Sequence, residues 1–180
     1  MAKNEIEGCV LLVDDEEAIR ESLSELLEAL GFKVYTADCV DNAIKVINKQ
    51  TDIEAIVSDL KMPVKMGVET LRYLNSIKRD IPVIFLTGYG NMETCQDALR
   101  EGAFDYILKP IDDKDKVLLP LKHAIERFRL KLANEELKLD ILRMAEEHEE
   151  LLNAILSDVD MKNQVQDKIN TIVKKWKKKK

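Results

Sequence analysis

Five short apolar segments, each followed by a stretch of helical periodicity, fill the first two thirds of this chain. The apolar segments lie at 9–14, 33–36, 55–59, 82–87 and 104–109. The stretches with helical periodicity lie at 18–30, 41–48, 68–77, 92–100 and from about 113 onward. Such regular alternation is typical of a parallel sheet with helices on both faces. The sequence therefore predicts an α/β fold with a doubly wound sheet, in which Gly31 and Gly102 end two of the helices.

The chain has 180 residues and two parts of different composition. Residues 1–116 carry 14 Lys and Arg against 23 Asp and Glu, whereas residues 117–180 carry 14 against 11. After Pro120 the sequence contains neither glycine nor proline, so it provides no signal that ends the fifth helix. We therefore expect a globular domain over 1–116 and a helical extension over 117–180.

Residues of the extension repeat with the heptad spacing of a coiled coil. Two rows with a period of seven residues, offset by four, form this pattern: Leu137, Met144 and Leu151, with Ile141, His148 and Ile155. The pattern is lost over 158–162 and resumes from Val165 to Trp176 as a shorter amphipathic piece. The prediction is a parallel homodimer through this helix.

Six lysines stand among the last seven residues. The favoured interpretation is a terminus that is simply solvated. The alternatives are that the lysines attract nucleic acid or an anionic membrane, or that the segment is not part of the natural protein. The extension lacks the turn of a helix-turn-helix, so direct DNA binding is not expected. No membrane span or signal peptide is expected either. Cys9, Cys39 and Cys95 lack metal-ligand spacing, which favours a cytoplasmic protein with reduced thiols.

Residues with reactive or charged side chains follow four of the predicted strands. They are Asp14 and Asp15 after the first strand, Asp59 after the third, Thr87 after the fourth and Lys109 after the fifth. In an open parallel sheet, ligands bind at the carboxyl ends of the strands near the point where strand order reverses. These side chains are therefore expected to meet in one crevice. Acids at a strand end can instead cap the following helix, which is the plainer interpretation of a lone Asp15.

Clustered carboxylates suit Mg²⁺, or Mn²⁺ in its place, because these ions prefer oxygen ligands. A carboxylate beside such an ion can attack a phosphoryl group, while Lys109 balances charge on the phosphoryl oxygens. Thr87 offers a hydroxyl to one of these oxygens and can move with it. The residues by themselves thus predict a metal-dependent phosphoryl acceptor.

Four sequence blocks resemble one known family: 11–16 (LLVDDE), 59–63 (DLKMP) followed by Gly67, 86–89 (LTGY) and 102–110 (GAFDYILKP). In this order and spacing, over about residues 6–128, the chain resembles the response-regulator receiver domain of two-component signalling. The resemblance implies a flavodoxin-like fold with strand order 2-1-3-4-5 and a cis Lys109–Pro110 bond. The loop 64–66 departs from the family pattern in chemistry but not in length.

The resemblance also implies a role for each residue of the crevice. Asp59 would accept the phosphoryl group from a histidine kinase or phosphotransfer protein. The metal would be bound by Asp14, Asp15, Asp59 and the backbone carbonyl of Lys61. Thr87 and Tyr106 would act as switch residues. Lys61 and Tyr89 occupy places that tune dephosphorylation in the family.

Other interpretations stay open. The chain can be the front part of a larger regulator or hybrid kinase whose effector lies beyond Lys180, or a coiled-coil scaffold whose receiver no longer signals. His148 faintly resembles the phosphoacceptor of kinase dimerisation helices, although a place in or beside the coil is favoured. No separate catalytic domain is expected, so the prediction is a signalling protein rather than an enzyme.

Overall fold

The structure, a computed structural model, describes residues 8–88 and 92–177. Strands and helices alternate along these residues, as predicted. The strands are β1 (Gly8–Val13), β2 (Phe32–Ala37), β3 (Ala55–Asp59), β4 (Val83–Thr87) and β5 (Asp105–Leu108). The helices are α1 (Glu17–Ala29), α2 (Val40–Lys49), α3 (Val68–Ser76), α4 (Met92–Arg100) and α5 (Asp115–Lys177).

The strands form one parallel sheet with the order β2-β1-β3-β4-β5. This confirms the flavodoxin-like, doubly wound α/β fold with strand order 2-1-3-4-5. The strand order reverses between β1 and β3, so their carboxyl ends flank the crevice where such sheets bind ligands. Val13 of β1 lies opposite Ser58 of β3. The next residues, Asp14 and Asp59, therefore follow neighbouring positions at the same edge of the sheet.

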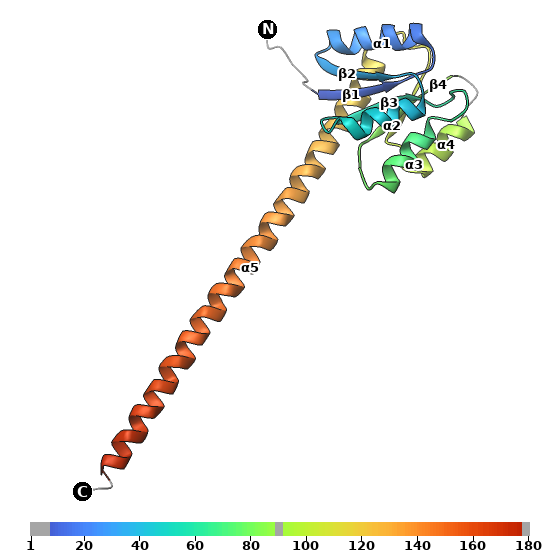
Figure 1. The fold of residues 1–180 in the computed structure, drawn as a ribbon. Helices are drawn as coiled ribbons and strands as arrows, with labels where there is room; N and C mark the ends of the chain where they lie inside the picture. The colour runs from blue at the N-terminus through green and yellow to red at the C-terminus, as the bar shows by residue number, and fades with distance from the viewer. Residues whose placement is uncertain (1–7, 89–91, 178–180) are drawn as a thin grey trace, which may run out of the picture. The chain divides into compact units, whose positions relative to one another are not determined.

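Two apolar layers, one on each face of the sheet, form the core, because successive side chains of a strand point to opposite faces. In β1, Leu11 and Val13 pack in the layer of α2, α3 and α4, whereas Val10 and Leu12 pack in the layer of α1 and the first turns of α5. Figure 1 shows the sheet between α1 and the helices α2 to α4. Both faces of the central strands are apolar, as a covered parallel sheet requires.

Two helices end at glycines in the left-handed conformation, as predicted. Gly31 after α1 has φ +95° and Gly102 after α4 has φ +104°. At the end of α4, the N–H of Gly102 donates to the carbonyl of Leu99 at 3.1 Å, and the N–H of Ala103 donates to that of Ala98 at 3.0 Å. These hydrogen bonds satisfy the last carbonyls of the helix and turn the chain into β5.

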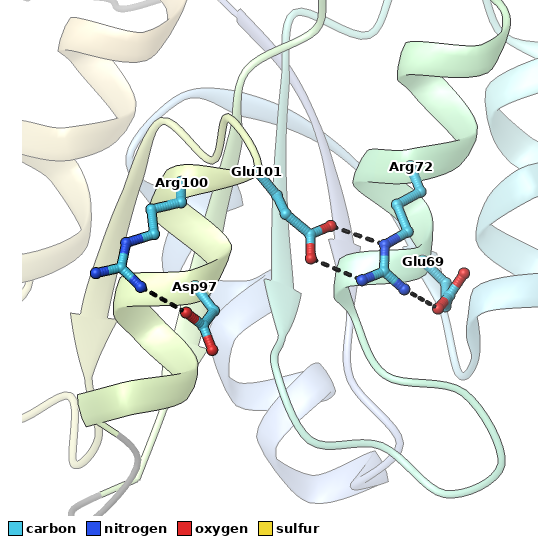
Figure 2. Close-up of polar contacts among 5 residues, drawn as sticks. All are labelled: Glu69, Arg72, Asp97, Arg100 and Glu101. Carbon is cyan, nitrogen blue, oxygen red and sulfur yellow. Dashed lines mark hydrogen bonds and ion pairs between the residues drawn. The ribbon is translucent and has the colours of Figure 1, made fainter.

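An ion-pair network joins α3 to the residue after α4 (Figure 2). Arg72 of α3 donates to both carboxylate oxygens of Glu101, at 2.7 Å from Nε and 2.6 Å from Nη2. Its Nη1 donates to Glu69 at 2.6 Å. Two hydrogen bonds join Arg72 to Glu101, which makes this contact stronger than the exposed pair of Arg100 with Asp97, where one nitrogen meets one oxygen. The network therefore links the residue after α4 to α3.

Helix α5 is 63 residues long and continues past Pro120 to Lys177, as predicted. The chain divides into two compact units, Met1–Leu132 and Ala133–Lys180. In the second unit more than half of the side-chain area is exposed for Leu137, Ile141, Met144, Leu151 and Ile155. The apolar row of the predicted coil is thus uncovered in the single chain.

None of the described helices combines the length and apolar character that a membrane crossing needs.

The loop between β3 and α3 follows a tightly constrained path. The N–H of Gly67 donates to the carbonyl of Leu60 at 3.1 Å, and a Cβ added at Gly67 would lie 2.1 Å from the carbonyl oxygen of Asp59. Glycine is therefore required at this position. Val64 has φ +69° and a fully exposed side chain. This left-handed conformation costs a residue with a Cβ about 1–2 kcal/mol, so the loop keeps its shape at a cost in strain.

Gly67→Ala is expected to lower the free energy of unfolding by about 2 kcal/mol or more, because the new Cβ must displace backbone rather than a flexible side chain. Gly88→Ala is the matched control, since no atom of the described residues lies within 4 Å of a Cβ there. Its effect should stay within about 0.5 kcal/mol. Urea unfolding followed by circular dichroism measures both variants. Equal stability of the two variants would contradict the close approach at Gly67.

Candidate functional site

Three carboxylates meet where β1 and β3 end. Asp14 and Asp15 follow β1, and Asp59 is the last residue of β3. One carboxylate oxygen of each residue lies within 4.8 Å of those of the other two. Asp14 is fully buried and Asp59 is 8% exposed, whereas Asp15 faces solvent. The crevice expected from the strand ends is present, and it is acidic.

The Lys109 ammonium is the counter-charge of this cluster. Its Nζ lies 3.0 Å from Asp14 Oδ2 and 3.5 Å from Asp59 Oδ1. The Lys109 N–H donates to the carbonyl of Thr87 at 2.8 Å, and the Lys109–Pro110 bond is cis as expected. Burial lowers the pKa of Lys109, but the hydrogen bond to Asp14 and the charges of Asp59 and Asp14 together raise it. The side chain is therefore held as a cation between two carboxylates.

The pKa of Asp59 is raised, and burial is the largest cause. The Lys109 charge lowers this pKa, the Asp14 charge raises it, and hydrogen bonds from the backbone of Lys61 and Leu60 lower it. Burial outweighs the single ammonium. A second cation in the crevice would offset the cost of keeping Asp59 ionised.

Asp14 is fixed by partners at several atoms. Its Oδ1 accepts the N–H of Glu16 at 2.9 Å, so the carboxylate holds the turn that leads from β1 into α1. Its carbonyl accepts a hydrogen bond from the Arg20 guanidinium at 2.7 Å, and its N–H donates to the carbonyl of Ala37 at 3.2 Å. One carboxylate thus holds the turn through Oδ1 and accepts from the Lys109 ammonium through Oδ2. Arg20 is not among the predicted site residues, because a contact with a backbone carbonyl leaves no signal in the sequence pattern.

The predicted switch residues lie on strands beside the carboxylate cluster. Thr87 ends β4 with 1% of its area exposed, and its hydroxyl donates to the next carbonyl at 3.4 Å. Tyr106 of β5 lies opposite Phe85 of β4. Its side chain is half-buried against the apolar layer of α2 to α4. Lys61 is exposed, two residues beyond Asp59, and Tyr89 lies outside the described residues. Direct contacts thus join the ammonium to the carboxylates, and strand pairing brings Thr87 to their edge.

The donor set fits a hard divalent cation. Three carboxylates supply oxygen ligands of the kind that Mg²⁺ prefers. Asp15 is open to solvent, which suits an ion that keeps several of its waters. The arrangement can therefore hold a divalent cation next to Asp59.

An apolar groove lies along α1 and reaches the crevice. Its lining residues are Ala18, Ile19, Ser22, Leu23 and Leu26 of α1 with Lys109, Pro110 and Ile111. Residues 19, 22, 23 and 26 have helical spacing, so they form one face of α1. The groove thus joins an apolar face of α1 to the Lys109–Pro110 turn beside the crevice.

Comparison with known proteins agrees with this geometry. The family model described as the response regulator receiver domain matches residues 10–121. The C4-dicarboxylate transport transcriptional regulatory protein DctD of Pseudomonas aeruginosa is 37% identical over 142 residues, which are 78% of this chain and 29% of that protein. A putative response regulator NtrX-like of Rickettsia typhi is 35% identical over 140 residues, with 76% and 29% covered. The chain spans less than a third of the length of these two relatives.

Solved structures show the same fold. A response regulator receiver domain protein from Clostridium thermocellum matches with a TM-score of 0.65 and 31% identity, covering 68% of this chain and 98% of that one. NtrX from Brucella abortus matches with a TM-score of 0.67 and 30% identity, covering 73% and 30%. Since the family match covers more than half of the sequence and includes the whole acidic crevice, this chain belongs to the response regulator receiver domain family of two-component signalling.

Proposed function

We propose that this chain is a response regulator that accepts a phosphoryl group on Asp59. The observation that carries the proposal is the Lys109 ammonium, which lies 3.5 Å from Asp59 and 3.0 Å from Asp14 inside an acidic crevice. A buried carboxylate beside a fixed cation and two further acids is arranged as a nucleophile for phosphoryl transfer. The relatives named as regulators support a signalling role rather than a separate enzyme activity.

In the proposed transfer, an Asp59 oxygen forms a bond to phosphorus while the bond from phosphorus to the donor histidine nitrogen breaks. The donor imidazole leaves with the electron pair of that bond, and it leaves as a neutral ring because its other nitrogen carries a proton when the bond breaks. Lys109 balances the charge on the phosphoryl oxygens from its position at the end of β5. Mg²⁺, or Mn²⁺ in its place, held by Asp14, Asp15, Asp59 and the carbonyl of Lys61, would neutralise charge on the transferring group.

The donor in this proposal is a histidine kinase or a phosphotransfer protein. The groove along α1 is apolar and ends at Lys109 and Pro110, next to the crevice. A donor helix bound there by its apolar face would bring a histidine on that helix toward Asp59. Such donors act inside the cell, so the proposal places the chain in the cytoplasm.

Thr87 and Tyr106 are the proposed readers of phosphorylation. The Thr87 hydroxyl makes a long hydrogen bond of 3.4 Å to a neighbouring carbonyl, which is a weak contact. A phosphoryl oxygen is a charged and stronger acceptor, so the hydroxyl is expected to exchange partners. Thr87 pairs with Leu108 of β5, two residues from Tyr106. A movement of β4 would therefore reach Tyr106 through the strand pairing.

The proposed output is a homodimer through α5, with the two helices parallel. The row of exposed apolar side chains that includes Leu137, Met144 and Leu151 has the seven-residue spacing that pairs two helices. His148 lies in this seam by its spacing, which favours a place in the coil over a phosphorelay role. The coil would connect the state of the receiver to the state of the assembly.

The second candidate is that the chain is the receiver and linker of a larger regulator or hybrid kinase. The observation that favours it is the length of the two relatives, of which the chain covers 29% each. A non-signalling coiled-coil scaffold is disfavoured, because all the acids of the crevice and Lys109 are in place.

Asp59→Asn is expected to abolish phosphorylation by acetyl phosphate and Mg²⁺, because an amide is a poor nucleophile for phosphorus. The wild type should give a shifted band on a Phos-tag gel, and chelation of Mg²⁺ should remove that band. Asp52→Asn, an exposed acid outside the crevice, is the matched control and should shift like the wild type. A wild type that never shifts would overturn the phosphoacceptor proposal.

Thr87→Ala is expected to keep phosphorylation on Asp59 but to remove the response of the neighbouring strands. Beryllofluoride with Mg²⁺ should change amide hydrogen exchange in β4 and β5 of the wild type, because the Thr87 hydroxyl changes its partner. Thr87→Ser keeps the hydroxyl and should preserve the change. If Thr87→Ala responded like the wild type, the switch role of Thr87 would be wrong.

Leu151→Glu is expected to convert the dimer to a monomer at micromolar concentration, because it places like charges in the paired seam. Leu142→Glu is the matched control, since Leu142 is equally exposed at 60% but lies outside the two heptad rows. Light scattering behind size exclusion should give twice the 20.6 kDa chain mass for wild type and control. A monomeric wild type, with and without beryllofluoride, would refute the dimer.

A further inference from the structure

The seam of α5 changes character after Ile155. Continuing the rows of Leu137 and Ile141 in steps of seven residues places Asp158 and Lys162 at seam positions. In a parallel pair of identical helices, each of these charges faces its own copy, and like charges in a seam oppose pairing. Apolar pairing along the coil is therefore expected to weaken at Asp158 and Lys162. The segment that follows is positively charged.

Residues 162–180 combine an apolar stripe with a strong positive charge. Val165, Ile169 and Ile172 are 56%, 47% and 61% exposed, and their spacing places them on one face of the helix. The sequence continues this spacing with Trp176, the single tryptophan of the chain. The segment carries eight lysines and one acidic residue, Asp167. Its described part, 162–177, is thus a basic amphipathic helix.

We propose that the segment 162–177 attaches the protein to the surface of an anionic lipid bilayer. The apolar stripe would enter the boundary between headgroups and acyl chains, and the lysines would face the acidic headgroups. A short apolar stripe or a lysine cluster alone gives weak attachment, whereas the two together reinforce each other. The helix would lie on the bilayer, in agreement with the finding that none of the described helices could cross one.

Two other partners fit these residues less well. Nucleic acid is contacted through phosphates, which needs no apolar stripe, and its recognition favours arginine, which is absent from 162–180. A coiled coil continued through this segment would bring two copies of the lysine cluster side by side. An anionic surface neutralises the same charges and covers the same stripe.

Attachment to a bilayer is a property separate from the proposed receiver function and does not depend on it. Phosphorylation involves the crevice at the ends of β1 and β3, which lies in the first compact unit. The bilayer segment lies in the second unit. The two properties can therefore be measured separately on the full chain.

Trp176 allows insertion to be measured directly, because no other tryptophan contributes to the emission. The full chain is titrated with vesicles of about equal parts phosphatidylglycerol and phosphatidylcholine at ~0.1 M salt. We expect a blue shift of the tryptophan emission, quenching by brominated acyl chains, and sedimentation with the vesicles. Vesicles of phosphatidylcholine alone should bind at least about tenfold more weakly, and ~0.5 M salt should weaken binding to the anionic vesicles.

A pair of double variants tests the apolar stripe at constant charge. Ile169→Asn with Ile172→Asn removes the stripe and is expected to abolish the blue shift. Asn163→Ala with Asn170→Ala alters residues outside the stripe and should insert like the wild type. Circular dichroism checks that both variants keep the helix.

Three outcomes would overturn the proposal. The first is that anionic vesicles cause neither a blue shift nor sedimentation. The second is vesicle binding without tryptophan burial, equal in both double variants. The third is tighter binding to duplex DNA than to the anionic vesicles, which would show attraction of a polycation only. Asp59 phosphorylation and the dimer mass are measured on the same samples, so a failure of the receiver function is recognised separately.

Discussion

The contact of the Lys109 ammonium with Asp14 and Asp59 is the interaction on which the crevice depends. Two like charges about 4 Å apart repel by roughly 4 kcal/mol at an effective dielectric constant of about 20. The ammonium lies 3.0 Å from one buried carboxylate and 3.5 Å from the other, so it offsets this repulsion. Its compensation is incomplete, because burial still raises the pKa of Asp59. The crevice therefore retains an electrostatic demand for a further cation.

The position of this ammonium depends on the sheet. Lys109 follows β5, an edge strand, while Asp14 follows β1 and Asp59 ends β3, both near the centre of the sheet. Apolar layers on both faces fix how far each strand extends, and the hydrogen bond from Lys109 N–H to the Thr87 carbonyl aligns the end of β5 with the end of β4. Close approach at Gly67 packs the next loop against Asp59. The chemistry of the site thus rests on register, which the core enforces.

The parts of the site that were predictable are those set by local periodicity and by the rule for parallel sheets. Asp14, Asp59 and Lys109 each mark the end of an apolar run, so the alternation of strands and helices was enough to bring them together. The Arg20 contact with a backbone carbonyl leaves no pattern in composition. The pairing of Arg72 with Glu101 joins residues 29 positions apart, which periodicity cannot connect.

Several functional details could not be predicted from residue pattern alone. The role of Tyr106 came from a family resemblance, and its half-buried place on β5 fits either a switch or a packing residue. The left-handed Val64 could not be foreseen, because a β-branched residue disfavours this conformation and the loop imposes it. Local preference was overruled there by the path that the chain must follow around Asp59.

Helix α5 shows how one regular element can require different partners along its length. Its first turns bury Val117 and Leu121 against the sheet, whereas Leu151 and Ile169 further along are about half exposed. Exposed apolar rows are unfavourable in water, and burying them gains roughly 25 cal/mol for each Å². Apolar area alone does not distinguish a second helix from a bilayer. The charges that flank the row make this distinction. A second copy of the helix places like charges side by side, whereas an anionic surface attracts and neutralises the lysines.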